Sequence, residues 1–183
     1  MSSMKAGAVP QSAPKLKAEE YSRLPAILGF KDELIEGERV LAPMPKFSHT
    51  VVLDKLEALL RKQFPQFRLA REAGWRFQSE DGSESVPGPD LMVLQAADYE
   101  KAAQSGGYFE GKPVFVIEVV SPTERKSRRM QKVGLYLEAG AGAVVEIDYT
   151  KRCAFVYRPD DDVPEVVRER IASPFSADLS DVF

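Results

Sequence analysis

Two acidic residues occupy apolar runs in which strands are expected. Glu118 lies inside the run 114–120 (VFVIEVV), and Asp90 follows Pro89 and begins a second run, 90–94 (DLMVL). An ionised carboxylate in an apolar layer is costly unless another group compensates its charge. Two such acids indicate a divalent cation between them, because hard ions such as Mg²⁺ prefer carboxylate oxygens. If the strands pair, both acids reach one ion; the alternative is that Lys or Arg neutralises each acid for structure alone.

The segment that follows Glu118 predicts a helix with one strongly basic face. At 3.6 residues per turn, that face carries Arg125, Arg128, Arg129 and Lys132. A run of charges is usually a solvated helix face. Because this one begins next to Glu118, we favour a surface that binds a phosphate-containing substrate, with one cation close enough to stabilise developing charge.

Other polar residues are weaker candidates. His49 follows Ser48, the predicted N-cap of a helix, and either orients water or phosphate or is an ordinary capping histidine. Glu33 and Glu36 lie on a predicted hairpin, where they either supplement the site or are ordinary hairpin charges. Asp148 ends a predicted strand, which favours a role in the turn.

Composition excludes several other chemistries. The chain has 183 residues, enough for one domain with a core, and a net charge of −3, so any basic surface must be local. Its one histidine and one cysteine cannot form a zinc cluster, and Cys153 has no partner for an intrachain disulfide, which fits a cytoplasmic location. There is no Gly-rich phosphate loop and no nucleophile elbow. No run reaches the roughly 18 apolar residues of a membrane span, so we expect no membrane association.

Periodicity and turn residues predict the elements that position these side chains. The patterns place a hairpin around Gly37, a helix from Ser48 to Phe64, and a helix capped by Ser121 and Glu124 that begins at Pro122. The remaining predicted elements are helices over 17–23 and 96–104, and strands over 75–78, 143–148, 153–158 and 166–171. Residues 1–16 are expected to form a flexible N-terminal tail, and residues 17–183 a single domain.

The order of these residues resembles the PD-(D/E)XK nuclease superfamily. Pro89-Asp90 is followed on the next long strand by Glu118-Val119-Val120. Within that superfamily, the chain is most similar to the Uma-type "putative restriction endonuclease" family over residues 17–183. The matching segments are 33–38, 43–49, 119–123, Lys132, Tyr136, 139–140, 147–148 and 156–158.

The resemblance implies an α/β (α+β) fold, a restriction-endonuclease-like mixed β-sheet flanked by helices. It implies that Asp90 and Glu118 hold a metal ion, Mg²⁺ or Mn²⁺, together with the main-chain carbonyl of Val119. The superfamily's usual lysine falls at Val120 and is absent, but the Uma-type pattern places a lysine on the following helix, which corresponds to Lys132.

The resemblance also places Glu33 and His49 near the site. The expected function is therefore hydrolysis of DNA by a metal-activated water, with Asp90, Glu118, Lys132, His49 and Glu33 as the catalytic set. The three arginines Arg125, Arg128 and Arg129 are expected to bind the DNA backbone.

Two alternatives remain open at this point. The chain departs from the family pattern at Glu124, at Arg128 and over 144–146. These departures and the missing lysine are also compatible with a protein that binds nucleic acid but no longer cleaves it. A third possibility is an interaction protein on the same fold that forms a homodimer or larger homo-oligomer through exposed strand edges.

Overall fold

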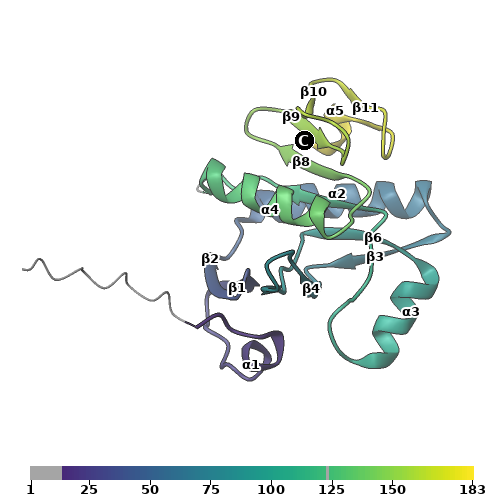
Figure 1. Ribbon diagram of the computed structural model, residues 1–183. Helices are drawn as coiled ribbons and strands as arrows, with labels where there is room; N and C mark the ends of the chain where they lie inside the picture. The colour runs from purple at the N-terminus through teal and green to yellow at the C-terminus, as the bar shows by residue number, and fades with distance from the viewer. Residues whose placement is uncertain (1–13, 123) are drawn as a thin grey trace, which may run out of the picture.

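The computed structural model describes residues 14–122 and 124–183 (Figure 1). The tail predicted over residues 1–16 therefore lies mostly outside the described residues. At its end, the Leu16 N–H donates to the Gly37 carbonyl at 2.8 Å, and Lys15 pairs with Asp81. Among the described helices, none has both the length and the apolar composition needed to cross a bilayer.

A six-stranded sheet forms the centre of the molecule. In spatial order its strands are β10 (Glu165–Val167), β9 (Cys153–Tyr157), β8 (Val144–Asp148), β7 (Phe115–Val119), β6 (Leu91–Gln95) and β3 (Phe67–Arg71). Only β7 and β8 are parallel, and the helix α4 (Lys126–Glu138) connects them, as a parallel crossover requires. The predicted mixed sheet flanked by helices is confirmed.

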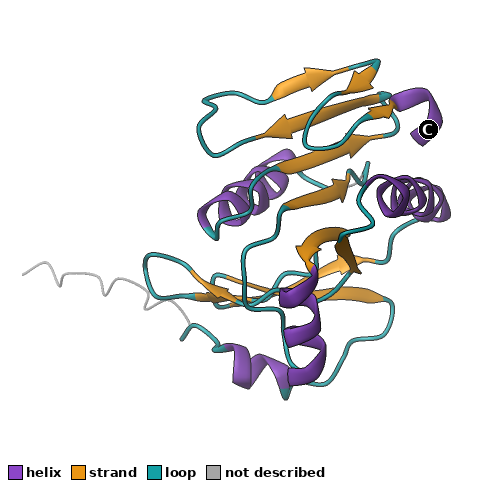
Figure 2. Cartoon of the chain, turned by 90° about the vertical axis from the view of Figure 1, so that its right-hand side faces the viewer, coloured by secondary structure: helices purple, strands orange, loops and turns teal. Residues whose placement is uncertain are grey.

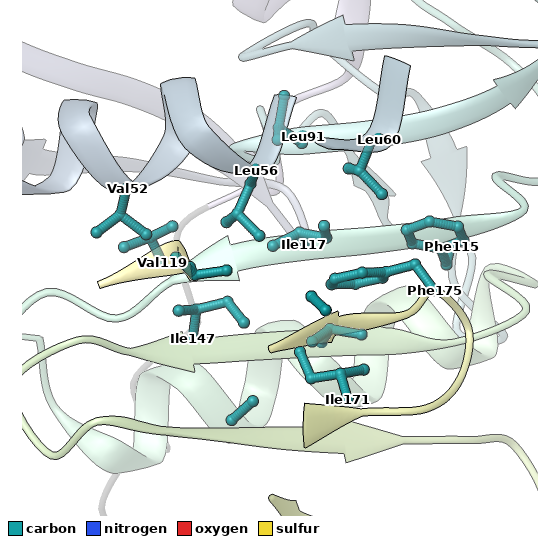
Figure 3. Packing of buried hydrophobic residues seen from close by; sticks show 14 of the residues in the cluster. Val52, Leu56, Leu60, Leu91, Phe115, Ile117, Val119, Ile147, Ile171 and Phe175 are labelled. Atoms are coloured by element: carbon teal, nitrogen blue, oxygen red, sulfur yellow. The ribbon is translucent and has the colours of Figure 1, made fainter. Parts of the chain in front are cut away.

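Helices cover the sheet on both faces (Figure 2). On one face, α2 (Phe47–Gln63) packs Leu56 and Leu60 against Phe115 and Ile117 of β7 (Figure 3). On the other face, α4 packs beside the alternate β7 residue Val116. Because side chains alternate along a strand, Glu118 faces the same side as Val116 and meets α4 rather than the core beneath α2.

The predicted hairpin is confirmed as β1 (Phe30–Ile35) paired with β2 (Glu38–Pro43). Its turn residues Glu36 and Gly37 both have positive φ, 51° and 81°, which a two-residue hairpin turn of this kind requires. Leu34 also bridges to Val86. This bridge holds β1 against the segment that leads to Asp90.

Smaller elements complete the fold. They are α1 (Ala18–Ser22), α3 (Ala96–Ser105), β4 (Phe77–Gln78), β5 (Glu84–Ser85), β11 (Arg170–Ile171), β12 (Ala177–Asp178) and α5 (Leu179–Val182). The single strand predicted over 166–171 was wrong, because β10 pairs with β9 whereas β11 pairs with β12 and buries Ile171. The strand predicted over 75–78 is limited to β4, and Trp75 makes only an isolated bridge to Phe109.

The predicted starts of two helices were wrong. The N-cap of helix α2 is Lys46, two residues before the predicted Ser48, and the Ser48 hydroxyl donates to Tyr149 instead of capping the helix. The helix α4 begins only at Lys126, after Arg125, whose ψ of 137° is extended. The Glu124 N–H instead donates to the Ser121 carbonyl at 3.1 Å, so Ser121 and Glu124 belong to a turn before the helix.

Candidate active site

The two strand-borne acids lie opposite each other. Strands β6 and β7 are antiparallel, with Leu91 opposite Ile117, so the next pair along the ladder is Asp90 and Glu118. Both acids have the parity of Met92, which packs on the α4 side of the sheet. The predicted pairing of the two strands is therefore confirmed.

Asp90 is held by three donors. Its Oδ2 accepts the Val119 N–H at 2.8 Å and lies 2.9 Å from His49 Nε2, and its Oδ1 lies 3.2 Å from Lys31 Nζ. Burial alone would raise the pKa of Asp90, but Lys31 and the hydrogen bond from His49 hold it well below its usual range. Asp90 is thus an anion with one oxygen fixed by α2 and β7.

His49 lies beneath Asp90 and is buried. Since the Asp90 carboxylate accepts, the His49 proton belongs on Nε2, and Nδ1 is left as an acceptor. Nδ1 is buried and finds no hydrogen-bond partner within the described part of the chain. The ring therefore orients Asp90 through Nε2, whereas Nδ1 is shielded from solvent.

Glu118 shares one oxygen between two donors from α4. Its Oε1 lies 3.0 Å from Lys132 Nζ and accepts the Tyr136 hydroxyl at 2.7 Å. Burial raises the pKa of Glu118, Asp90 and Glu33 add to this rise, and Lys132 and Lys31 oppose it, so that the pKa is raised to about 7. The site therefore contains a carboxylate that is poorly compensated by protein cations.

Lys132 connects two elements that are distant in sequence. Its Nζ lies 3.3 Å from Glu33 Oε1, which also accepts the Gly88 N–H at 3.0 Å. Burial would lower the pKa of Lys132, but Glu118 and Glu33 raise it well above its usual range. The ammonium is therefore permanently charged, and β1 places Glu33 beside it.

The predicted basic face of α4 is divided between two acids. Lys132 turns to Glu118, whereas Arg129 binds Glu146 of β8 through two hydrogen bonds of 2.9 and 2.7 Å. Arg125 is exposed at the helix start. Arg128 has a buried Nη2 without a hydrogen-bond partner among residues 14–122 and 124–183.

Two weaker candidates are explained by other contacts. Glu36 accepts a hydrogen bond from Gln131 of α4. Asp148 accepts from the Thr150 hydroxyl and from the Lys151 N–H, which is the turn role that the sequence predicted. Sequence reasoning missed Lys31, although its spacing from Glu33 already placed both side chains on one face of β1.

Comparison with known proteins identifies the family. The family model described as "Uma2: Putative restriction endonuclease" matches residues 18–180. The chain belongs to the Uma2 family. The Uma2 resemblance inferred from the motifs is thus confirmed over nearly the whole chain.

Solved structures agree with the Uma2 fold. A crystal structure described as "a putative nuclease belonging to DUF820" from Anabaena variabilis is similar, with a TM-score of 0.75 and 22% identity over 90% of this chain and 96% of that chain. At this identity the likeness establishes the fold alone. The DrdV–DNA complex is also similar over 74% of this chain and 12% of that chain, but its TM-score of 0.36 and 11% identity carry no weight. No curated protein matches the chain.

The donors of this Uma2 site suit a metal ion that keeps most of its water. Within the described ranges, no group of three His, Cys, Asp and Glu side chains converges as a complete metal cage. Mg²⁺ typically binds through one or two carboxylates and retains several waters. Asp90 and Glu118 supply such oxygens, and the three acids Glu33, Asp90 and Glu118 share the two lysines Lys31 and Lys132. The residues present therefore fit a divalent cation.

Proposed function

We propose that the chain is a metal-dependent endonuclease that hydrolyses DNA phosphodiester bonds. The observation that carries this proposal is the position of Asp90, directly before β6, beside Glu118 of the paired strand β7, with Asp90 Oδ2 bound by the Val119 N–H and Lys132 Nζ 3.0 Å from Glu118. Two carboxylates beside one fixed ammonium match the needs of phosphate-ester hydrolysis, in which negative charge develops on the phosphate oxygens. Membership of a family described as "Putative restriction endonuclease" supports DNA as the substrate.

Asp90 and Glu118, with the Val119 carbonyl, would hold Mg²⁺, with Mn²⁺ as a substitute. When bound, such an ion supplies Lewis acidity and lowers the pKa of a coordinated water. His49 fixes the orientation of Asp90 by its hydrogen bond, and the Val119 N–H fixes the same oxygen from the other side. Preorganised donors of this kind need no rearrangement during the reaction.

Lys132 is the residue that stabilises charge on the substrate phosphate. It is buried, and Glu33 and Glu118 hold its ammonium in one place. A phosphate at the acid pair would give that ammonium a third anionic partner. Arg125, exposed at the start of the same helix, and Arg128 are proposed to bind the flanking DNA backbone, whereas Arg129 is engaged by Glu146.

The position of Lys132 favours this function over a protein that only binds nucleic acid. That alternative rests mainly on the missing lysine at position 120, where Val120 is buried. Lys132 brings an ammonium to the same glutamate from the following helix. Lys132 therefore supplies the positive charge that a lysine at position 120 would have supplied.

Plasmid nicking tests the proposal. Supercoiled DNA is incubated with Mg²⁺ and either the unchanged protein, Asp90→Asn or Glu118→Gln. Glu100→Gln is the matched control, because Glu100 is an exposed acid on α3. We expect nicking by the unchanged protein and the control, and none by the two site variants or in EDTA. Equal nicking by Asp90→Asn and the unchanged protein would overturn the proposal.

A further inference from the structure

A pocket of about 340 Å³ adjoins the acid pair. It lies where β1, the end of β2 and the segment before Asp90 meet. Lys31 lines it and contacts Asp90 Oδ1 at 3.2 Å, and Gly88 lines it and donates to Glu33. The pocket and the acid pair therefore share a wall. A larger cavity between α1 and α3 includes none of these residues.

The walls of this pocket are aromatic and apolar. Its lining includes Tyr21, Phe30, Met44 and Tyr108. The Tyr21 hydroxyl donates to the Asp32 carbonyl at 2.9 Å, so the polar end of that ring is already satisfied. A side chain at Gly74 would approach the Tyr108 ring to 2.7 Å, so glycine at this position leaves the ring in place. Flat π surfaces of this kind suit a planar, uncharged ring.

The charges of the lining favour a base over a phosphate. Asp32 and Glu72 line the pocket, and Asp32 is paired with Arg39. Lys31, the cation in the lining, points its ammonium at Asp90. A phosphate inside the pocket would meet carboxylates, whereas the amino and imino groups of a nucleobase can donate to them. The volume is at the small end of the range for ligand pockets, roughly 300–1,000 Å³, and suits a single unit.

We propose that this pocket receives one unpaired nucleobase beside the scissile phosphate, so that the substrate is single-stranded DNA or DNA with an unpaired nucleotide. This inference rests on the proposed function and adds the substrate class to it. A base in an intact duplex is stacked and paired, and extracting it has a free-energy cost that an already unpaired base avoids. The geometry thus selects for distorted or single-stranded DNA.

Binding without divalent ions tests the pocket. Fluorescence anisotropy in EDTA gives the Kd of three labelled oligonucleotides of one sequence, which are a single strand, a perfect duplex and a duplex with a one-nucleotide bulge. We expect the first and third to bind about tenfold or more tightly than the duplex. Phe30→Ala should weaken binding of these two by about 5- to 100-fold and leave duplex binding unchanged.

Two further variants make the test decisive. Leu28→Ala is the matched control, because Leu28 is 93% exposed, is two residues from Phe30 and does not line the pocket. Met44→Ala removes another side chain from the pocket wall. Because Met44 is 57% exposed, the variant should still fold. Like Phe30→Ala, it should weaken binding of the single strand and the bulged duplex. If the unchanged protein binds the duplex as tightly as the single strand, or if both pocket variants bind like Leu28→Ala, the pocket proposal is overturned.

The two proposals fail in different ways. If the protein nicks DNA with Mg²⁺ but Phe30→Ala does not change its preference for unpaired DNA, the pocket proposal is wrong and the nuclease proposal stands. If the protein prefers unpaired DNA through Phe30 but does not nick DNA, the nuclease proposal is wrong and the pocket for an unpaired base stands.

Discussion

A half-buried glutamate, Glu118, and a buried one, Glu146, lie side by side on neighbouring strands, and their surroundings differ. Glu118 of β7 is the register partner of Glu146 of β8, and both face α4. Glu146 receives both arms of the Arg129 guanidinium, at 2.9 and 2.7 Å, and the Tyr157 hydroxyl at 2.8 Å. A planar fork that matches both oxygens fixes the geometry of the pair and leaves the carboxylate fully engaged.

Glu118 has a tyrosine and a cation as well, but its cation is shared. Lys132 is a point charge, and Glu33 competes for it at 3.3 Å. Both protein contacts of Glu118 fall on Oε1. An arginine on α4 therefore engages both oxygens of Glu146, whereas Glu118 shares the ammonium of Lys132 with Glu33.

Removing the arginine should give the largest effect. Arg129→Ala leaves Glu146 buried and unpaired, so we expect a loss of about 3–5 kcal/mol in the free energy of unfolding, measured by urea denaturation. The double variant Arg129→Met with Glu146→Leu removes both charges and should recover most of that loss. An unfolding curve for Arg129→Ala that matches the unchanged protein would show that the Glu146 cluster is not structural.

Removing the lysine should act on catalysis instead. We expect Lys132→Ala to lower the single-turnover nicking rate by about 10²–10³-fold, because the substrate phosphate loses its fixed cation. Lys126→Ala is the matched control, since Lys126 is an exposed lysine on the same helix. A rate for Lys132→Ala close to that of the control would remove the lysine from the mechanism.

The same small change in both clusters sharpens the contrast. Tyr136→Phe and Tyr157→Phe each delete one hydrogen bond to a carboxylate, worth about 1.5–3 kcal/mol. For Tyr157→Phe we expect this loss in unfolding free energy with an unchanged nicking rate. For Tyr136→Phe we expect the nicking rate to fall about tenfold. Equal effects of both variants on nicking would show that the two clusters act as one.

The turn that contains Asp148 lies outside both clusters. Changing Asp148 should have the smallest effect on stability, and that effect should depend on pH. Burial would raise the pKa of Asp148, but hydrogen bonds from Thr150 and Lys151 lower it below its usual value. An acid with a lowered pKa adds stability above the pKa of the unfolded chain, about 3.9, and this is lost as pH falls through the folded value. Asp148→Asn should therefore be about 1 kcal/mol less stable than the unchanged protein at pH 7, and this difference should disappear as the pH falls through the folded value. A difference in melting that persists at low pH would contradict this reading.

The acid pair could be predicted because it depends on local rules. Alternation along two strands fixed the faces of Asp90 and Glu118, and Gly37 marked the hairpin that carries Glu33. The family pattern then indicated Lys132. These features depend on the alternation of side chains along a strand or on the residues of a turn, and both are determined by residues that are close in sequence.

The pairing of charges across elements could not be predicted. Helical spacing places Arg129 and Lys132 on one face, but it does not state which acid each one reaches, because that depends on the position of α4 over β7 and β8. Lys31 was missed for the same reason, since its partner Asp90 is 59 residues away. The Ser121 cap was wrong because the path of the chain over the sheet overrides a local preference.

The charged centre draws on five separate stretches of chain, and its ion pair between Glu33 and Lys132 joins residues 99 positions apart. No fragment that ends before α4 can contain the complete set. Under the proposed function, a chain that folds during synthesis would therefore not cleave nearby DNA until the ribosome has passed that helix. Onset of activity would then report completion of the tertiary fold, and a series of C-terminally shortened chains should lose both together.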